Sequence, residues 1–78
     1  MEMIRVHSSS IDKVGYTPKY SDGAPAIFVV FKGSPKRTYV YGVPRKRAFY
    51  RLLGAESVGR HFNKYIQKCY PLIEILDK

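Results

Sequence analysis

The segment that most constrains the fold spans residues 26–31 and reads Ala-Ile-Phe-Val-Val-Phe. Alternate side chains of an extended chain project from opposite faces, and here both faces are apolar. The segment is therefore expected as a central strand of a sheet. The next five residues, 32–36, contain Gly and Pro and predict a hairpin loop. They would return the chain antiparallel along residues 37–42.

Two further strands are expected before this hairpin. Residues 3–7 fit a short edge strand, and residues 11–17 fit a longer one that places Val14 and Tyr16 on one face. Gly15 within the longer strand permits a β-bulge or a close approach. The residues that follow are rich in turn formers, with Asp22-Gly23 as the expected tip.

Two helices are expected after the hairpin. Pro44 suits the first turn of one helix, and Gly54 is its expected stop. Ser57 is a plausible N-cap for a second helix that runs to Cys69, and Pro71 ends it. The apolar face predicted for this second helix consists of Val58, Phe62, Tyr65, Ile66 and Cys69.

The pattern does not decide between strand and helix for residues 72–76. The elements together predict one α+β domain over residues 1–78: a small antiparallel β-meander of about three to four strands, followed by a helical hairpin packed on one face. No stretch approaches the roughly 18 apolar residues of a membrane span. The start shows no apolar run of a signal peptide, and the single cysteine suits a reducing compartment, so a cytoplasmic location is expected.

The charge of the chain is unevenly distributed. The formal net charge is +8, and residues 23–55 contain no acid. The bases in that window are Lys32, Lys36, Arg37, Arg45, Lys46, Arg47 and Arg51. Such a field favours a polyanionic partner, whether nucleic acid, an acidic protein or an anionic membrane surface, although excess charge can also serve solubility alone. We expect no membrane partner.

Aromatic residues are interleaved with these bases. Tyr39 and Tyr41 share one face of the strand 37–42, where they could stack on bases or could equally form part of the core. Basic stripes on the two helices could contact phosphate or could be ordinary solvated faces. The residues predicted to bind nucleic acid are Lys36, Arg37, Tyr39, Tyr41, Arg45, Lys46, Arg47, Arg51, Arg60 and Lys64.

Signals for catalysis are weak. His7 and His61 lie far apart in sequence, Cys69 falls on the predicted apolar face, and the glycines fit no phosphate-binding loop. No catalytic residue, metal site or cofactor is therefore predicted. One enzymatic alternative uses Tyr39, Tyr41, Arg47 and His61 for metal-free RNA cleavage, as in small toxin nucleases.

Four segments, taken together and in order, resemble the KTSC domain family. They are residues 6–16 with Ser8-Ser9 and Val14-Gly15-Tyr16, residues 28–33, residues 39–44 with Tyr39-Val40-Tyr41, and residues 52–63 with Ser57, Gly59, Phe62 and Asn63. The resemblance covers about residues 6–71. This family consists of short modules found at the C-terminus of some lysyl-tRNA synthetases and as free-standing proteins of bacteria and phages.

The resemblance implies RNA binding as the expected function and carries over no catalytic residue. The family positions matched here are Ser8, Ser9, Val14, Gly15, Tyr16, Tyr39, Tyr41, Val43, Pro44, Ser57, Gly59, Phe62 and Asn63. The family often has an acid directly after Val-Gly-Tyr, whereas this chain has Thr17.

We therefore expect a small basic module that binds RNA, tRNA-like or single-stranded, or else single-stranded DNA, without catalysis. The alternatives are an RNase-like toxin and a phage or bacterial interaction module for an acidic protein. The sequence predicts neither the oligomeric state nor the nucleotide preference.

Overall fold

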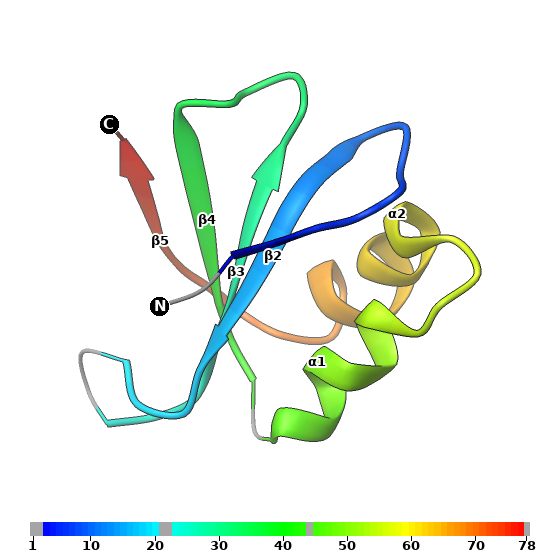
Figure 1. Cartoon of the computed structure of the whole chain (residues 1–78). Coiled ribbons are helices and arrows are strands. Elements are labelled where there is room, and N and C mark those ends of the chain that lie inside the picture. Colours follow the sequence, from blue (N-terminus) through cyan, green and yellow to red (C-terminus); the bar gives the residue numbers. More distant parts are fainter. Residues whose placement is uncertain (1–2, 21–22, 44, 78) are drawn as a thin grey trace.

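The computed structural model describes residues 3–20, 23–43 and 45–77. Its five strands form one antiparallel sheet in the order β1-β2-β3-β4-β5 (Figure 1). The strands are β1 (Met3–Arg5), β2 (Ile11–Thr17), β3 (Ala26–Phe31), β4 (Arg37–Gly42) and β5 (Leu72–Asp77). The predicted antiparallel meander is thus confirmed, but it has five strands instead of the expected three to four. Residues 72–76 belong to the fifth strand.

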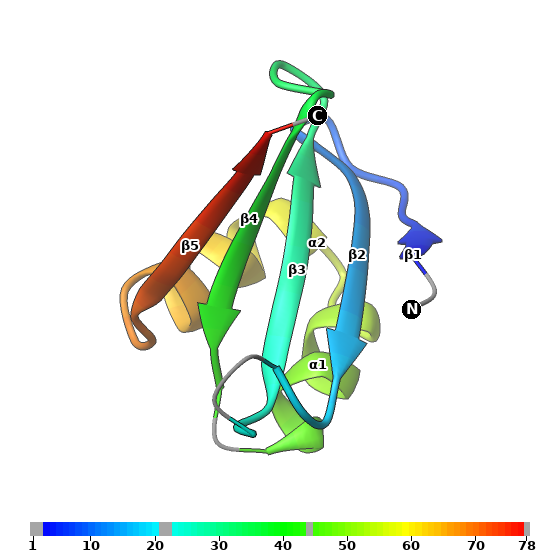
Figure 2. The same ribbon diagram turned by 90° about the vertical axis from the view of Figure 1, so that its left-hand side faces the viewer.

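The helices interrupt the meander between its fourth and fifth strands. They are α1 (Lys46–Leu53), α2 (Val58–His61) and the π-helix η1 (Phe62–Gln67), which continues α2 directly. All of them lie on one face of the sheet. In Figure 2 the strands are in front and the helices lie behind them. The prediction that the helices come last is wrong, because β5 returns to pair with β4 at the sheet edge.

Strand β3 occupies the centre of the sheet, as its two apolar faces predict. Ile27 and Val29 are fully buried in the main core beneath the helices. Phe28, on the opposite face, is 3% exposed and belongs to a separate small cluster. A strand with two apolar faces is stable here because the main core buries one face and the small cluster buries the other.

The main core lies between the sheet and the helices. Its buried residues come from three strands, from the segment just after β4 and from each of the helices α1, α2 and η1: Ile11, Val14, Ile27, Val29, Tyr41, Val43, Phe49, Leu52, Val58, Phe62 and Ile66. Phe62 at the start of η1 is the largest fully buried side chain, and the rings of Phe31 and Tyr41 meet it edge to face. This aromatic contact fixes the position of η1 over the sheet.

The opposite face is closed by the sheet's own side chains and by a loop residue. Phe28 and Val40 are buried there beneath Met3 and Tyr20. The Tyr20 ring packs edge-on against Phe28 at 5.5 Å, and its hydroxyl donates a hydrogen bond to Glu74 of β5. Tyr20 therefore connects the loop after β2 to the edge strand.

The local signals at turns and helix ends are mostly confirmed. Ser57 is the N-cap of α2 and accepts a hydrogen bond from the Arg60 amide at 3.3 Å. Gly54 follows the last residue of α1, as predicted. The N-cap of α1 is Arg45, whereas Pro44 and Asp22 fall outside the described residues.

Two predictions about local geometry need correction. Strand β2 is irregular between Ile11 and Lys13, whereas Gly15 stays in register opposite Phe28. In the second helical segment, Tyr65 and Cys69 are exposed although the helical period placed both on the apolar face. The reason is the π-helical stretch, whose wider turn shifts every later residue away from a 3.6-residue repeat. Within the described part of the chain, no helix is long and apolar enough to cross a membrane.

Candidate nucleic-acid interface

A pocket of about 480 Å³ lies beside α1 and the segment from His61 to Tyr70. It is lined by Arg45, Arg47, Ala48, Arg51, His61, Tyr65, Ile66, Cys69 and Tyr70. We call this hollow the α1–η1 pocket. It brings three arginines, one histidine and two tyrosines together from segments that are separate in sequence, and no acid is among its described lining residues.

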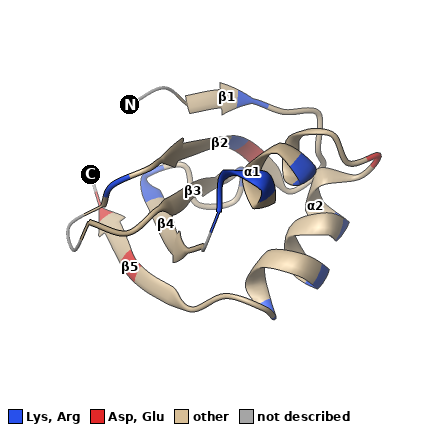
Figure 3. Ribbon diagram, turned by 90° about the horizontal axis from the view of Figure 1, so that it is seen from below, with Lys and Arg blue, Asp and Glu red and all other residues tan. Residues whose placement is uncertain are grey.

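The position of the arginines follows from the amphipathic character of α1. Phe49 and Leu52 are buried and hold one side of the helix against the core. Arg47 and Arg51 are one turn apart, and both are exposed at the pocket. Arg45 precedes the helix in an extended conformation and adds a third guanidinium. The α1 side of the pocket is therefore cationic; the ribbon is blue at the Lys and Arg positions of the helices in Figure 3.

His61 contributes an imidazole to the same pocket. Burial lowers the pKa of His61 below its ordinary value, and the nearby Arg51 charge lowers this pKa further. The imidazole ring lies 4.7 Å from the Tyr65 ring, measured between centroids. A neutral histidine can accept or donate a hydrogen bond, so His61 can contact either a hydroxyl or a base edge.

Tyr65 supplies an exposed aromatic ring at the pocket. It is 49% exposed, and the Lys64 ammonium lies 5.4 Å from its ring centroid. The sequence interpretation missed Tyr65 as a site residue because the helical period assigned it to the core. A π-helical stretch leaves no simple pattern in the sequence. The only usable signal for Tyr65 is His61, which precedes it by four residues, about one helical turn.

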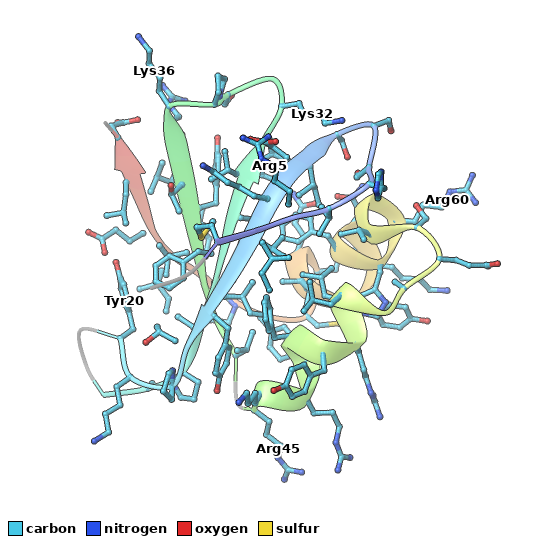
Figure 4. The ribbon with its side chains drawn as sticks, in the orientation of Figure 1. Arg5, Tyr20, Lys32, Lys36, Arg45 and Arg60 are labelled. Carbon is cyan, nitrogen blue, oxygen red and sulfur yellow. The ribbon has the colours of Figure 1, made fainter. Side chains whose placement is uncertain are left out.

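The remaining predicted bases do not all join this pocket. Lys36 lies at the β3–β4 hairpin, at the opposite end of the molecule from Arg45 (Figure 4). Arg37 is paired with Asp77 at 3.2 Å, which neutralises part of its charge. Lys46 lies over the Tyr50 ring at 5.3 Å, and the hydrogen bond to Tyr50 raises the pKa of Lys46. The basic residues of positions 23–55 therefore lie at two different ends of the fold.

The two tyrosines of β4 face the helices. Tyr41 is 5% exposed and packs in the core, where burial, and then neighbouring Tyr39, raise its pKa. Tyr39 is half-buried and meets Phe31 edge to face at 5.2 Å. Of the two alternatives left open by the sequence, the core role is the one observed for Tyr41, so its ring is not free to stack on a base.

A second, smaller hollow of about 340 Å³ joins the β1–β2 loop to the start of α2. Its lining is His7, Ser8, Ser9, Ser10, Glu56, Ser57, Gly59, Arg60 and Asn63. The Ser8 hydroxyl accepts hydrogen bonds from the amides of Ser10 and Ile11, each at 3.2 Å. A Cβ atom on Gly59 would lie only 2.8 Å from the Ser10 hydroxyl. Glycine is therefore what lets this loop pack directly on the helix.

This second hollow gathers several positions on which the family resemblance rests, including Ser8, Ser57, Gly59 and Asn63. Arg60, from the predicted interface, lines it as well and points away from the sheet (Figure 4). The contacts of Ser8 and Gly59 account for these residues by local folding. Within the described residues, no group of three or more His, Cys, Asp or Glu side chains could hold a metal ion.

Comparison with known proteins agrees with the resemblance seen in the sequence. No curated protein matches the chain. The crystal structure of a KTSC domain protein from Yersinia pestis is similar, with a TM-score of 0.76 and 25% sequence identity over 99% of this chain and 96% of that one. The model of the KTSC domain matches residues 7–70. The chain belongs to the KTSC domain family.

Proposed function

We propose that this KTSC domain binds RNA, in a tRNA-like or single-stranded form, through the α1–η1 pocket. One observation carries the proposal: Arg45, Arg47 and Arg51 line a single pocket whose described lining contains no acid. Guanidinium groups gathered in this way attract phosphate, and Arg can bind phosphate oxygens through two parallel hydrogen bonds.

The rings beside the arginines favour RNA over a purely electrostatic partner. Tyr65 is half exposed, and a base stacked on such a ring contributes about 1–3 kcal/mol of binding free energy. His61 lies against that ring and offers hydrogen bonds. Sequence-specific RNA recognition usually targets unpaired bases through stacking and base-edge hydrogen bonds. The resemblance to modules attached to lysyl-tRNA synthetases points the same way.

Two double variants of equal charge change test the proposal. Arg47→Ala with Arg51→Ala removes two charges at the pocket, and Lys32→Ala with Lys36→Ala removes two at the far hairpin (Figure 4). Binding of a labelled single-stranded RNA is measured by fluorescence anisotropy at several salt concentrations. With four to six phosphate contacts on a single strand, the log–log slope should be about −3 to −4 for the unmodified protein.

The pocket variant should weaken binding and reduce the magnitude of the slope by about 1.4, the value for two lost single-strand contacts. The hairpin variant should keep a slope close to that of the unmodified protein. Equal losses in both variants, or no binding at low salt, would contradict the proposal. Competition by polyglutamate as strong as that by RNA would instead assign the pocket to an acidic protein.

A second candidate function is metal-free RNA cleavage, because the structure brings Arg47 and His61 to one pocket. The lowered pKa of His61 leaves its imidazole free to accept a proton from a ribose 2′-hydroxyl. An adjacent arginine would stabilise the charge that develops on the phosphate. This candidate predicts cleavage of RNA, but not of DNA, in the presence of EDTA. His61→Ala should abolish the cleavage; intact RNA after prolonged incubation would exclude the candidate.

A further inference from the structure

We infer that the α1–η1 pocket accepts a single unpaired nucleotide that carries a terminal phosphate. This inference rests on the proposed function and names the part of the RNA that is recognised. The pocket has two unlike sides: the arginines on and before α1, and the His61, Tyr65 and Tyr70 side chains from the end of α2 and the segment that follows it. A nucleoside monophosphate has the same division, with an anionic group at one end and a flat ring at the other.

The volume of the pocket suits a group of this kind. Small-ligand sites in proteins occupy about 300–1,000 Å³, and this pocket measures about 480 Å³. Ala48 and Ile66 give it an apolar portion, which a base can cover without leaving polar groups unpaired. One nucleotide therefore fits, whereas a longer stretch of chain would have to lie outside.

The concave shape disfavours duplex RNA. A double helix presents its phosphates along convex ridges but keeps its bases stacked inside, so it cannot place a phosphate and a base in this pocket together. An unpaired end or an extruded nucleotide can place both its phosphate and its base inside. The exposed ring of Tyr65 would then stack on the base that a duplex cannot offer.

The charge of the pocket distinguishes a terminal phosphate from one within the chain. A phosphate within the chain carries one negative charge, whereas a terminal phosphate carries about −1.5 to −2 at neutral pH. Arg45, Arg47 and Arg51 supply three positive charges, and none of the ion pairs in the described structure involves them. Three unpaired guanidinium groups are better matched by the more highly charged terminal phosphate.

Cys69 provides a direct reporter of occupancy. It is the only cysteine of the chain, it is exposed, and it lines the pocket. Alkylation of Cys69 by a maleimide, followed by mass spectrometry, should therefore slow when a ligand fills the pocket. The probes are one RNA oligonucleotide with a 5′-phosphate, a 3′-phosphate or hydroxyls at both ends, a blunt duplex of the same sequence, and free adenosine monophosphate.

At least one phosphorylated single strand should protect Cys69 at concentrations about tenfold or more below those needed by the oligonucleotide with hydroxyl ends. A tenfold difference in the protecting concentration is the gain expected from the additional charge-assisted hydrogen bonds between the arginines and the terminal phosphate. The blunt duplex should protect poorly. The Arg47→Ala, Arg51→Ala variant should lose the preference for phosphate, and the Lys32→Ala, Lys36→Ala variant should keep it.

The outcomes separate this inference from the proposed function. Equal protection by phosphorylated and hydroxyl-ended strands would overturn the terminal-phosphate inference and leave RNA binding intact. RNA binding in anisotropy with no protection of Cys69 would overturn the choice of pocket. Protection by free adenosine monophosphate alone would support recognition of the nucleotide but contradict the RNA-binding function. Cys69→Ser, measured by anisotropy, controls for any role of the thiol in binding.

Discussion

The rings of Tyr41 and Phe62 meet edge to face with their centroids 5.2 Å apart, joining β4 to the first residue of η1. Both residues are buried, and Phe31 contacts Phe62 from the neighbouring strand. This contact locates η1 on the sheet and, with it, the Tyr65 and Tyr70 side of the α1–η1 pocket. The core and the candidate site therefore share one structural support.

Removing this support should destabilise the domain. Phe62→Ala deletes the largest fully buried side chain, and we expect the free energy of unfolding to fall by about 3–5 kcal/mol. Tyr41→Phe keeps the ring contact and should change it by less than about 1 kcal/mol. Urea unfolding followed by circular dichroism measures both. A similar loss for the two variants would show that the Tyr41 hydroxyl contributes as much to stability as the Phe62 ring, and would contradict the expectation.

Two glycines near the helices should respond in opposite ways to alanine. Gly54 has φ −87° and an ordinary 3.5 Å contact for an added Cβ, so Gly54→Ala should stabilise by about 0.4–1 kcal/mol. An added Cβ on Gly59 would lie 2.8 Å from the Ser10 hydroxyl. We expect Gly59→Ala to cost about 1 kcal/mol despite the better helix propensity of alanine.

Thermal unfolding of these variants checks the expectation, and a rescue makes it specific. Adding Ser10→Ala to Gly59→Ala removes the clashing hydroxyl and should restore part of the lost stability. If Gly59→Ala were as stabilising as Gly54→Ala, close packing of the β1–β2 loop on α2 would not be the reason for glycine at this position.

Acid should destabilise the fold through His61. Burial, and then Arg51, hold the folded-state pKa of His61 below 6.5, its usual value in an unfolded chain. The stability linked to neutral His61 is therefore present above about pH 6.5 and is lost as the pH falls toward the folded-state pKa. Urea unfolding between pH 5 and pH 8 should show a smaller pH dependence for His61→Gln than for the unmodified protein.

The cause of this pKa shift can be tested separately. Arg51→Ala should raise the pKa of His61 in an NMR titration, because it removes the nearby positive charge. Lys32→Ala, at the β3–β4 loop, is the matched control and should leave the titration unchanged. Equal shifts in the two variants would mean that His61 senses the overall charge of the protein rather than Arg51.

The Tyr20–Glu74 hydrogen bond should protect the edge strand β5. Tyr20→Phe keeps the ring contact with Phe28 but removes the hydroxyl, so amide exchange in β5 should accelerate. The hydrogen bond to Glu74 raises the pKa of Tyr20 above 10, its usual value. The stabilising effect of the Tyr20–Glu74 hydrogen bond is therefore present below pH 10 and is lost as the pH rises above 10. Unchanged β5 exchange in Tyr20→Phe would show that strand pairing alone holds this edge.

The strands could be predicted because their signals are local. Ala26–Phe31 is apolar on both faces and is the central strand, and Ser57 caps α2 as its side chain predicts. The pairing of β5 with β4 could not be predicted, because it depends on contacts across more than thirty residues, such as Val40 opposite Glu74. Local sequence carries little information about such pairings.

The candidate site could be predicted only in part. Arg47 and Arg51 share a helix, so their proximity follows from the sequence, but the position of His61 beside them depends on how α2 packs against α1. A 3.6-residue period predicts Tyr65 in the core, whereas the chain forms a π-helix there and leaves Tyr65 exposed. Lys36 and Arg45 both belong to the segment 23–55 that contains no acid, yet they lie at opposite ends of β4.

The most direct test of RNA binding at the α1–η1 pocket is an NMR titration of the ¹⁵N-labelled protein with single-stranded RNA carrying terminal phosphates. We predict that the largest amide shift changes fall on residues 45–51 and 61–70, which contain the residues that line the pocket. The hairpin at residues 32–36 and strand β5 should change little. Changes centred on that hairpin or on β5, or no changes at low salt, would contradict the account.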